Sequence, residues 1–319
     1  MVLPLSGALR DWGRLLRVSL FATAAADPLV GVALAGGTPE PRLALAPLAS
    51  LGVYHGAMVL NDLADRRLDA ERGRARPLVE GRIAPGAAAL AVLALFAGGL
   101  ALAWAAGGGA GLAWLGAAAA VAVLYDLAGR GPWLGPALLA LARGTNLLFG
   151  AACAGWVPAE GAWVPVVAAI GYGAYVLTVS RLGRMEDGDE GEDLGARPAS
   201  HLRVAAGLLL AVPVVVGAAA WLAAPLPRET ALVAALAGAF VGLRLLSSSV
   251  RPLAGAASRD SWTPAAVEGV MGLALSRFLP LTLGCLLLAR PEPWHLALAA
   301  GLLLLGRAGR ALMATFPPS

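Results

Sequence analysis

Three aspartates follow the end of an apolar segment at a spacing that places them together. Asp62, Asp65 and Asp69 recur at steps of three and four residues within the polar stretch 61–85. On a helix this spacing puts the three carboxylates on one face, where like charges repel. The arrangement becomes favourable when a positive group lies among them, and Mg²⁺ prefers oxygen ligands such as carboxylates. The spacing therefore predicts a metal site.

A second acidic stretch lies further along the chain. Six carboxylates occur in the eight residues from Glu186 to Asp193, interrupted by two glycines. Taken alone, such a run is typical of a solvated loop. It could instead close a metal and anion site opposite the first stretch, because guanidinium groups flank it and these bind phosphate oxygens well. The flanking arginines are Arg181, Arg184 and Arg197.

The composition is that of an integral membrane protein. Of 319 residues, 59% are apolar and only 14% are charged, whereas a soluble domain has about 25% charged residues. The net charge of +4 does not indicate nucleic-acid binding, because the arginines lie in short loops between apolar runs. Cys153 and Cys285 fall inside apolar segments, which predicts neither a disulfide framework nor a zinc site.

Ten apolar runs are long enough to cross a bilayer, which takes about 20 residues per helix. They lack the alternation that a membrane barrel needs. We therefore expect an all-α, polytopic transmembrane bundle of about nine to ten helices, forming one domain over residues 1–319, with a central cavity. The runs are 17–36, 43–62, 86–106, 109–126, 134–155, 162–180, 203–224, 229–248, 264–289 and 293–312.

Arginine-rich and arginine-poor loops alternate along the chain. Because cytoplasmic loops carry an excess of positive residues, the alternation predicts a protein of the cell membrane with both acidic stretches, and hence the cavity mouth, toward the cytoplasm. The arginine-rich loops are 63–85, 126–133, 181–203 and 244–263.

The first polar stretch carries a family likeness. Asn61-Asp62-x-x-Asp65-x-x-x-Asp69 is followed by Arg76-Pro77-Leu78 and Gly81-x-Ile83. This sequence matches the NDxxDxxxD and RPLxxGxI pattern of the UbiA superfamily of intramembrane prenyltransferases, and with the membrane topology the chain resembles that superfamily over nearly its whole length. The resemblance implies that the acidic motifs bind Mg²⁺, that Mg²⁺ binds the diphosphate of a polyprenyl donor, and that the prenyl tail lies between helices.

The second stretch departs from the family pattern, DxxxxxxDxxDDxxxGxK. Alignment on Gly195 places Ser180, rather than a carboxylate, at the first Asp. A different register would use Glu186 and Asp189. With Ser180-Arg181 at this position, the chain resembles a divergent branch of UbiA-like proteins. In the Gly195 register, the other family positions fall on Asp187, Glu190 and Arg197.

The resemblance also assigns roles to individual residues. The family has a Tyr and a basic residue after its fourth helix, which Tyr125 and Arg130 match. Catalytic roles are implied for Asp62, Asp65, Asp187 and Glu190, and the implied metal ligands are Asp62, Asp65, Asp69, Glu186, Asp187 and Glu190. Substrate contacts are implied for Asn61, Arg76, Tyr125, Ser180, Arg181 and Arg197.

Charged residues also occur inside the apolar runs. Asp27, Arg143 and Arg277 lie at depths where an unpaired charge costs about 2.5 kcal/mol or more. Each must face the interior of the bundle or a wet cavity. Asp27 either pairs with one of these arginines to lock helices together or belongs to the site. Arg143, with Asn146 one turn further on, is expected to bind substrate, because its helix begins on the side where the acidic stretches lie.

Three functions remain open from these residues. The first is Mg²⁺-dependent transfer of a polyprenyl group from its diphosphate to a lipophilic or aromatic acceptor, in contact with membrane lipid. The second is a terpene cyclase that uses the same diphosphate chemistry without an acceptor. The third is a non-catalytic membrane transporter or lipid-binding protein that retains the diphosphate site.

Overall fold

The structure is a computed structural model, and among the residues that it describes all regular elements are helices. The first helix is short, and a 3₁₀ turn precedes each of the next two. The described residues are 7–129, 131–158, 163–186, 188, 192–223, 229–289, 291–313 and 316. The elements are α1 (Gly7–Leu15), η1 (Val18–Leu20), α2 (Phe21–Leu34), η2 (Pro41–Ala44), α3 (Leu45–Glu71), α4 (Pro85–Ala128), α5 (Leu134–Cys153), α6 (Val164–Gly183), α7 (Arg197–Leu222), α8 (Glu229–Ala256), α9 (Pro264–Leu275), α10 (Phe278–Leu288) and α11 (Pro293–Met313).

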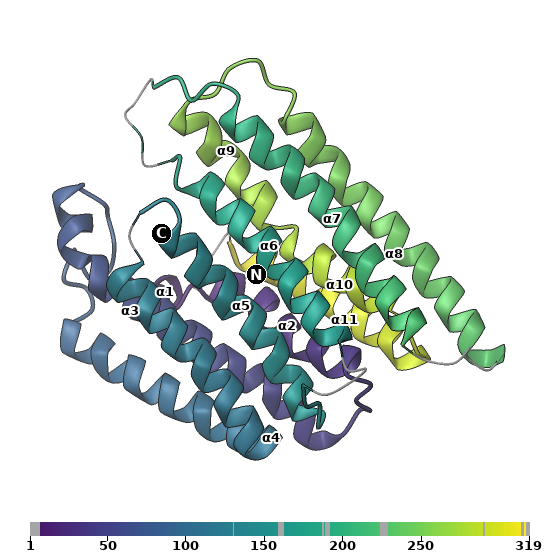
Figure 1. The fold of residues 1–319 in the computed structure, drawn as a ribbon. Helices are drawn as coiled ribbons and strands as arrows, with labels where there is room; N and C mark the ends of the chain where they lie inside the picture. The colour runs from purple at the N-terminus through teal and green to yellow at the C-terminus, as the bar shows by residue number, and fades with distance from the viewer. Residues whose placement is uncertain are drawn as a thin grey trace, which may run out of the picture.

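The all-α, multi-pass architecture expected from the sequence is confirmed. Eight helices of the described residues are long and apolar enough to cross a membrane, and a ninth span forms if α1 and the η1–α2 segment, bent by 48°, count as one. In this total α4 counts once, although it contains two of the ten apolar runs. Gly108 has φ 58° and ψ −146°, a conformation closed to other residues, and the chain reverses there. Figure 1 shows the two halves of α4 as a hairpin.

One predicted span is broken in the middle. The apolar run 264–289 forms α9 and α10, which are separated at Ser276 and Arg277. Pro280 explains the break, because it has no N–H to donate to the carbonyl of Ser276 four residues earlier, and its ring crowds that carbonyl. Arg277 therefore lies at a helix break rather than within a continuous helix.

The helices form a closed bundle. Each of α2 to α8 packs against the next helix in the chain, and α10 packs against both α8 and α2 (Figure 1). Inside this ring α2 also crosses α5 at close range. A side chain at Gly31 would overlap the Leu147 carbonyl oxygen, and one at Gly150 would overlap the carbonyl oxygen of Pro28. These two glycines let α2 and α5 approach, and the approach brings Asp27 to Asn146.

We expect Gly150→Ala to destabilise the protein by about 1–3 kcal/mol, because the added methyl group has to push α2 away from α5. Gly116→Ala is the matched control. It lies in α4, where a Cβ would meet nothing within 4 Å, and alanine is the better helix former by about 1 kcal/mol. Denaturation of both variants in mixed micelles checks the prediction. Equal stability of the two variants would contradict it.

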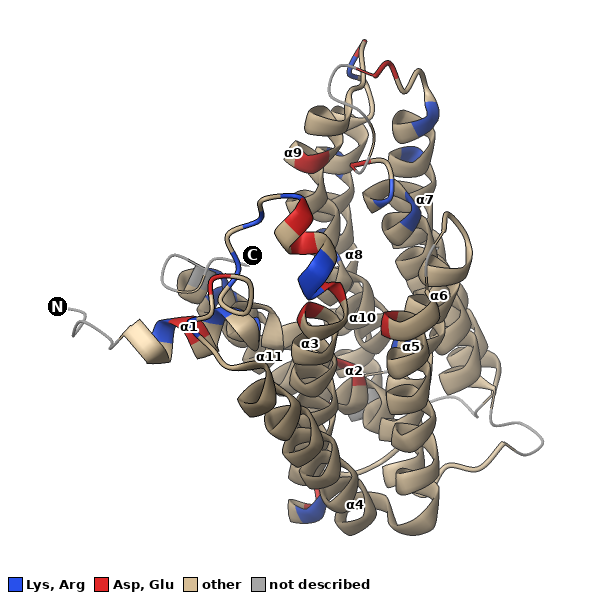
Figure 2. Cartoon of the chain, turned by 90° about the vertical axis from the view of Figure 1, so that its left-hand side faces the viewer, with Lys and Arg blue, Asp and Glu red and all other residues tan. Residues whose placement is uncertain are grey.

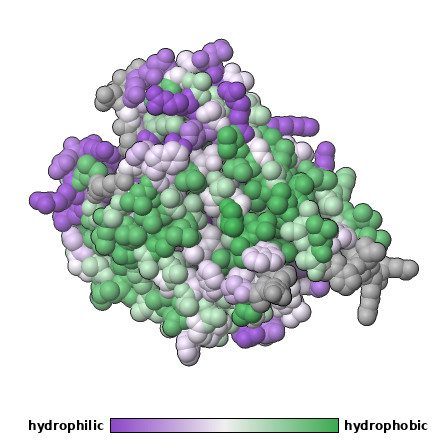
Figure 3. Space-filling view, viewed as in Figure 1, coloured by the Kyte–Doolittle hydropathy of each residue, from purple (hydrophilic) through white to green (hydrophobic). Residues whose placement is uncertain are grey.

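The surface has the polarity of a membrane protein. Large apolar side chains are exposed around the middle of the bundle, among them Leu90, Ile170 and Phe240. Figure 3 shows this apolar face between polar ends. In Figure 2 most charged residues gather at the end of the bundle where α3 finishes. This end carries the polar cavity.

Candidate active site

A polar cavity of about 290 Å³ opens between the ends of α3, α4 and α6. Its floor and walls combine carboxylates with several guanidinium groups, a mixture suited to a multiply charged anion and a cation together. The lining residues are Asn61, Asp65, Leu68, Arg72, Arg74, Arg76, Tyr125, Asp126, Gly129 and Arg184. Of the predicted site residues, Asn61, Asp65, Arg76 and Tyr125 are thus brought together.

The positive group expected among the three aspartates is an arginine in this structure. Arg76 forms an ion pair with Asp62, and its Nε lies 3.1 Å from Oδ2 of Asp69. Both carboxylates are 1% exposed, and Arg74 adds a second contact to Asp69 at 3.2 Å. Asp62 and Asp69 are therefore neutralised from the side of the following loop, while Asp65 faces the cavity.

The loop after α3 positions Arg76. Leu78 and Ile83 are buried in an apolar cluster with Leu15 of α1, so the loop is anchored on either side of its turn. Gly81 has φ 70°, a left-handed conformation that favours glycine. The backbone N–H groups of Arg82 and Ile83 both donate to the Pro77 carbonyl. This geometry explains why Arg-Pro-Leu and Gly-x-Ile follow the aspartates.

A residue that sequence reasoning did not assign to the site, Arg17, reaches it from the N-terminus. Its Nη2 lies 3.4 Å from Oδ1 of Asp62. Its backbone has φ 50° and ψ 46°, and it is the one non-glycine residue with positive φ among the described residues. A left-handed conformation of this kind costs about 1–3 kcal/mol and tends to occur at functional sites.

Asp126 is the second site residue that sequence reasoning missed. It is 8% exposed and accepts a hydrogen bond of 3.0 Å from the Asn61 amide on Oδ1, whereas its Oδ2 is buried without a hydrogen-bond partner. Asp62 and Asp65 both act on it electrostatically. The signal in the sequence was a carboxylate at the end of an apolar run beside Tyr125. Its role became visible only when α4 was placed against α3.

The second acidic stretch lies partly within the described residues. Ser180 is half-buried near the end of α6, Glu186 is half-buried after it, and Asp187, Asp189 and Glu190 lie outside the described residues, as does Arg130. Arg184 reaches the cavity and donates to the Gly129 carbonyl at 3.0 Å.

The two arginines assigned to substrate in this region lie elsewhere. Arg181 stacks on Trp133, with its guanidinium carbon 3.4 Å from the ring centroid. Arg197 is exposed at the start of α7 and lines a separate surface hollow with Asp193 and Ser200. Their predicted contacts with substrate stay predictions.

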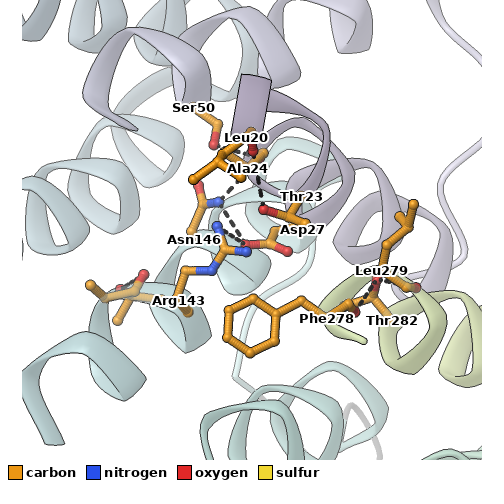
Figure 4. Close-up of polar contacts among 12 residues, drawn as sticks. Leu20, Thr23, Ala24, Asp27, Ser50, Arg143, Asn146, Phe278, Leu279 and Thr282 are labelled. Carbon is orange, nitrogen blue, oxygen red and sulfur yellow. Dashed lines mark hydrogen bonds and ion pairs between the residues drawn. The ribbon is translucent and has the colours of Figure 1, made fainter. Parts of the chain in front are cut away.

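Arg143 and Asn146 do not line the cavity. They belong to a buried polar cluster deeper in the bundle, in which Arg143 Nη1 lies 3.2 Å from Oδ2 of Asp27 (Figure 4). The pairing of Asp27 with an intramembrane arginine, one of the two readings of the sequence, is therefore present in the structure.

Protein side chains alone do not form a complete metal site in the described part of the chain. There, no three His, Cys, Asp or Glu side chains are close enough together to hold an ion. This fits the behaviour of Mg²⁺, which takes one or two carboxylates and completes its octahedron with water and substrate phosphates.

Fold and cavity together define an all-α, multi-pass membrane protein with a charged site at one end of its bundle. The model of the UbiA prenyltransferase family matches residues 20–252, and the chain belongs to this family. The resemblance seen in the sequence is thus confirmed. No curated protein matches the chain.

Solved structures show the same fold. One, concerned with digeranylgeranylglyceryl phosphate synthase in membranes, has a TM-score of 0.57 at 16% identity and covers 87% of this chain and 98% of its own. A UbiA homologue from Archaeoglobus fulgidus bound to DMAPP and Mg²⁺ has a TM-score of 0.53 at 17% identity, over 88% of this chain and 99% of its own. An apo UbiA homologue from Aeropyrum pernix K1 has a TM-score of 0.54 at 20% identity, and the match covers 84% of this chain and 97% of the homologue.

Proposed function

We propose that this protein is a Mg²⁺-dependent intramembrane prenyltransferase that moves a prenyl group from its diphosphate to a lipophilic or aromatic acceptor. The observation that carries the proposal is the cavity of about 290 Å³, in which four arginines face two carboxylates at the polar end of an apolar bundle. Membership in the UbiA prenyltransferase family supports it, as does the homologue of the same fold that binds DMAPP and Mg²⁺.

The residues present fit a magnesium ion. Asp126 has a buried carboxylate oxygen without a hydrogen-bond partner, and Asp65 and Asn61 line the same cavity. Asp65, Asp126 and the Asn61 amide oxygen would hold the ion from α3 and α4. Bound there, Mg²⁺ would stabilise the negative charge that develops on the departing diphosphate.

The arginines of the cavity bind and orient the diphosphate. Arg72, Arg74, Arg76 and Arg184 line the cavity, and guanidinium groups bind phosphate oxygens with two parallel hydrogen bonds. Because Arg76 is fixed by Asp62 and Asp69, its donors are pre-oriented before substrate arrives. Cleavage of the allylic C–O bond leaves a carbocation, and the apolar bundle below the cavity excludes the water that would quench it.

We further propose that the cavity opens toward the cytoplasm of a cell-membrane protein. The described arginines of α1, of the loop after α3 and of the segment between α6 and α7 lie at the end of the bundle where the cavity lies (Figure 2). The opposite end, where α3 begins, carries Arg42. By the positive-inside rule, this distribution of arginines supports a cavity on the cytoplasmic side. Cysteines introduced after Glu71 and at Gly37 would be labelled from opposite sides of sealed vesicles.

Pyrophosphate release by the purified protein in nanodiscs tests the proposed activity. Geranyl, farnesyl and geranylgeranyl diphosphates are each supplied with and without Mg²⁺, and with and without a lipid extract. The organic products are identified by mass spectrometry. We expect Mg²⁺-dependent release that requires the extract. Release without the extract, giving a cyclic product, would establish the cyclase instead. Transport of intact diphosphate without release would establish the transporter.

Asp126→Asn is expected to raise the Mg²⁺ concentration needed for half-maximal release by about 10–100-fold, since a neutral amide replaces a buried carboxylate at the site. Glu40→Gln is the control, because Glu40 is exposed at the opposite end of the bundle, where it pairs with Arg42. A magnesium titration of both variants checks the expectation. An unchanged Mg²⁺ requirement in Asp126→Asn would remove Asp126 from the proposed ligands.

A further inference from the structure

A cluster of polar side chains lies inside the bundle, below the cavity. Asp27 of α2 and Asn146 of α5 are 1% and 7% exposed, and the side chain of Arg143 is 12% exposed. Asn146 Nδ2 donates to Oδ2 of Asp27 at 3.2 Å, and Arg143 Nη1 lies at the same distance from that oxygen. Figure 4 shows these three side chains converging from two helices.

The cluster has hydrogen-bonding capacity that the protein does not use. Arg143 Nε and Nη2, Asp27 Oδ1 and Asn146 Oδ1 are buried without a hydrogen-bond partner. Leaving such groups unpaired costs about 1–3 kcal/mol each, and more for charged groups. The unused atoms are two donors of Arg143 and one acceptor each of Asp27 and Asn146, and the buried Tyr172 hydroxyl beside them also has no hydrogen-bond partner. Together they supply the donors and acceptors that a hydroxyl or carbonyl group needs.

Aromatic rings line the same place. The guanidinium carbon of Arg143 lies 5.6 Å from the centroid of the Tyr172 ring and 5.5 Å from that of Phe278. The two rings meet edge to face, 6.0 Å apart. Such walls favour a flat aromatic ligand over an aliphatic one.

The depth of the cluster suits the second substrate of the reaction. Tyr54 acts electrostatically on both Arg17, beside the cavity, and Arg143. On α3 it precedes Asp62 by eight residues, which is about 12 Å along the helix axis. A diphosphate bound in the cavity would lie at the Asp62 end of that interval, and an aromatic ring held by the cluster would lie on the side of the bundle interior.

The charge of the cluster limits the ligand class. Asp27 and Arg143 neutralise each other, and a further charge in this low-dielectric interior would have no partner. We propose that Asp27, Arg143 and Asn146 bind the hydroxyl or carbonyl group of a neutral, lipophilic aromatic acceptor. As an acceptor site this rests on the proposed prenyl transfer, and it excludes acceptors that enter as carboxylates or phosphates.

Equilibrium dialysis of radiolabelled para-hexylphenol and para-hexylbenzoate against protein in nanodiscs tests the proposal without turnover. We expect the wild type to bind the phenol at least about tenfold more tightly than the benzoate, and Asn146→Leu to weaken phenol binding about tenfold through the loss of its hydrogen bonds. Thr145→Val is the control, since Thr145 is equally buried and its hydroxyl bonds only to its own helix at Leu141 and Ala142.

A variant that changes the charge of the cluster provides a second, independent test of the proposal. Asp27→Asn leaves Arg143 unneutralised, so we expect it to reverse the preference toward para-hexylbenzoate; melting curves with and without Mg²⁺ and donor verify that each variant is folded. Equal binding of both probes to wild type, or phenol binding unchanged in Asn146→Leu, would overturn the proposal. If the phenol binds as expected and no donor yields pyrophosphate, the cluster stands as a binding site and prenyl transfer falls.

Discussion

Asp65→Asn lowers the kcat/KM of Mg²⁺-dependent pyrophosphate release about a thousandfold, which corresponds to about 4 kcal/mol of transition-state stabilisation. This is the expected result, because Asp65 is the aspartate of the motif that lines the cavity, whereas Asp62 and Asp69 are held by Arg76. The amide keeps the size of the side chain and removes the charge that would hold the metal beside the leaving group.

The control for this variant is Glu71→Gln. Glu71 ends the same helix and is exposed, so the same acid-to-amide change there is expected to leave kcat/KM within about twofold, as for most surface substitutions. Initial rates over a range of donor concentrations give kcat/KM, and a magnesium titration separates loss of metal binding from loss of chemistry. Wild-type rates in Asp65→Asn would end the magnesium hypothesis at this cavity.

Arg76→Met is expected to lower the free energy of unfolding by about 3–5 kcal/mol, the cost of removing one partner from a buried ion pair. The Arg76 side chain is 11% exposed and holds two carboxylates that are each 1% exposed. Without it, Asp62 and Asp69 repel each other on one face of α3, where Arg17 still pairs with Asp62 and Arg74 with Asp69. Unfolding in mixed micelles, followed by tryptophan fluorescence, measures the loss.

Arg42→Met provides the matched comparison. Arg42 and Glu40 are about half exposed, at 55% and 48%, and such a surface pair contributes at most about 1 kcal/mol. Loss of stability in Arg76→Met no greater than in Arg42→Met would mean that the guanidinium does not hold the two aspartates together. A triple variant that also carries Asp62→Asn and Asp69→Asn should regain part of the stability, because the two buried side chains that Arg76 contacts then carry no charge.

The sequence by itself determined the class of protein and predicted the first half of the candidate site. Length and hydropathy of the apolar runs determine membrane helices locally, since each needs only about 20 apolar residues in a row. Spacing along one helix likewise placed Asp62, Asp65 and Asp69 on a common face. The loop motif beginning at Arg76 was recognisable for the same reason, because it follows within a few residues.

Only the tertiary structure decided how these parts meet. Asp126 and Arg17 reach the aspartates from segments far along the chain, and nothing in the local sequence fixes the rotation of α4 or the left-handed turn at Arg17. The same holds for Asp27 and Arg143, 116 positions apart in the sequence, which pair because two glycines let α2 and α5 cross closely. Helix propensity and hydropathy act over one turn or one span, whereas the partner of a buried charge is set by packing between helices, and packing depends on the whole bundle at once.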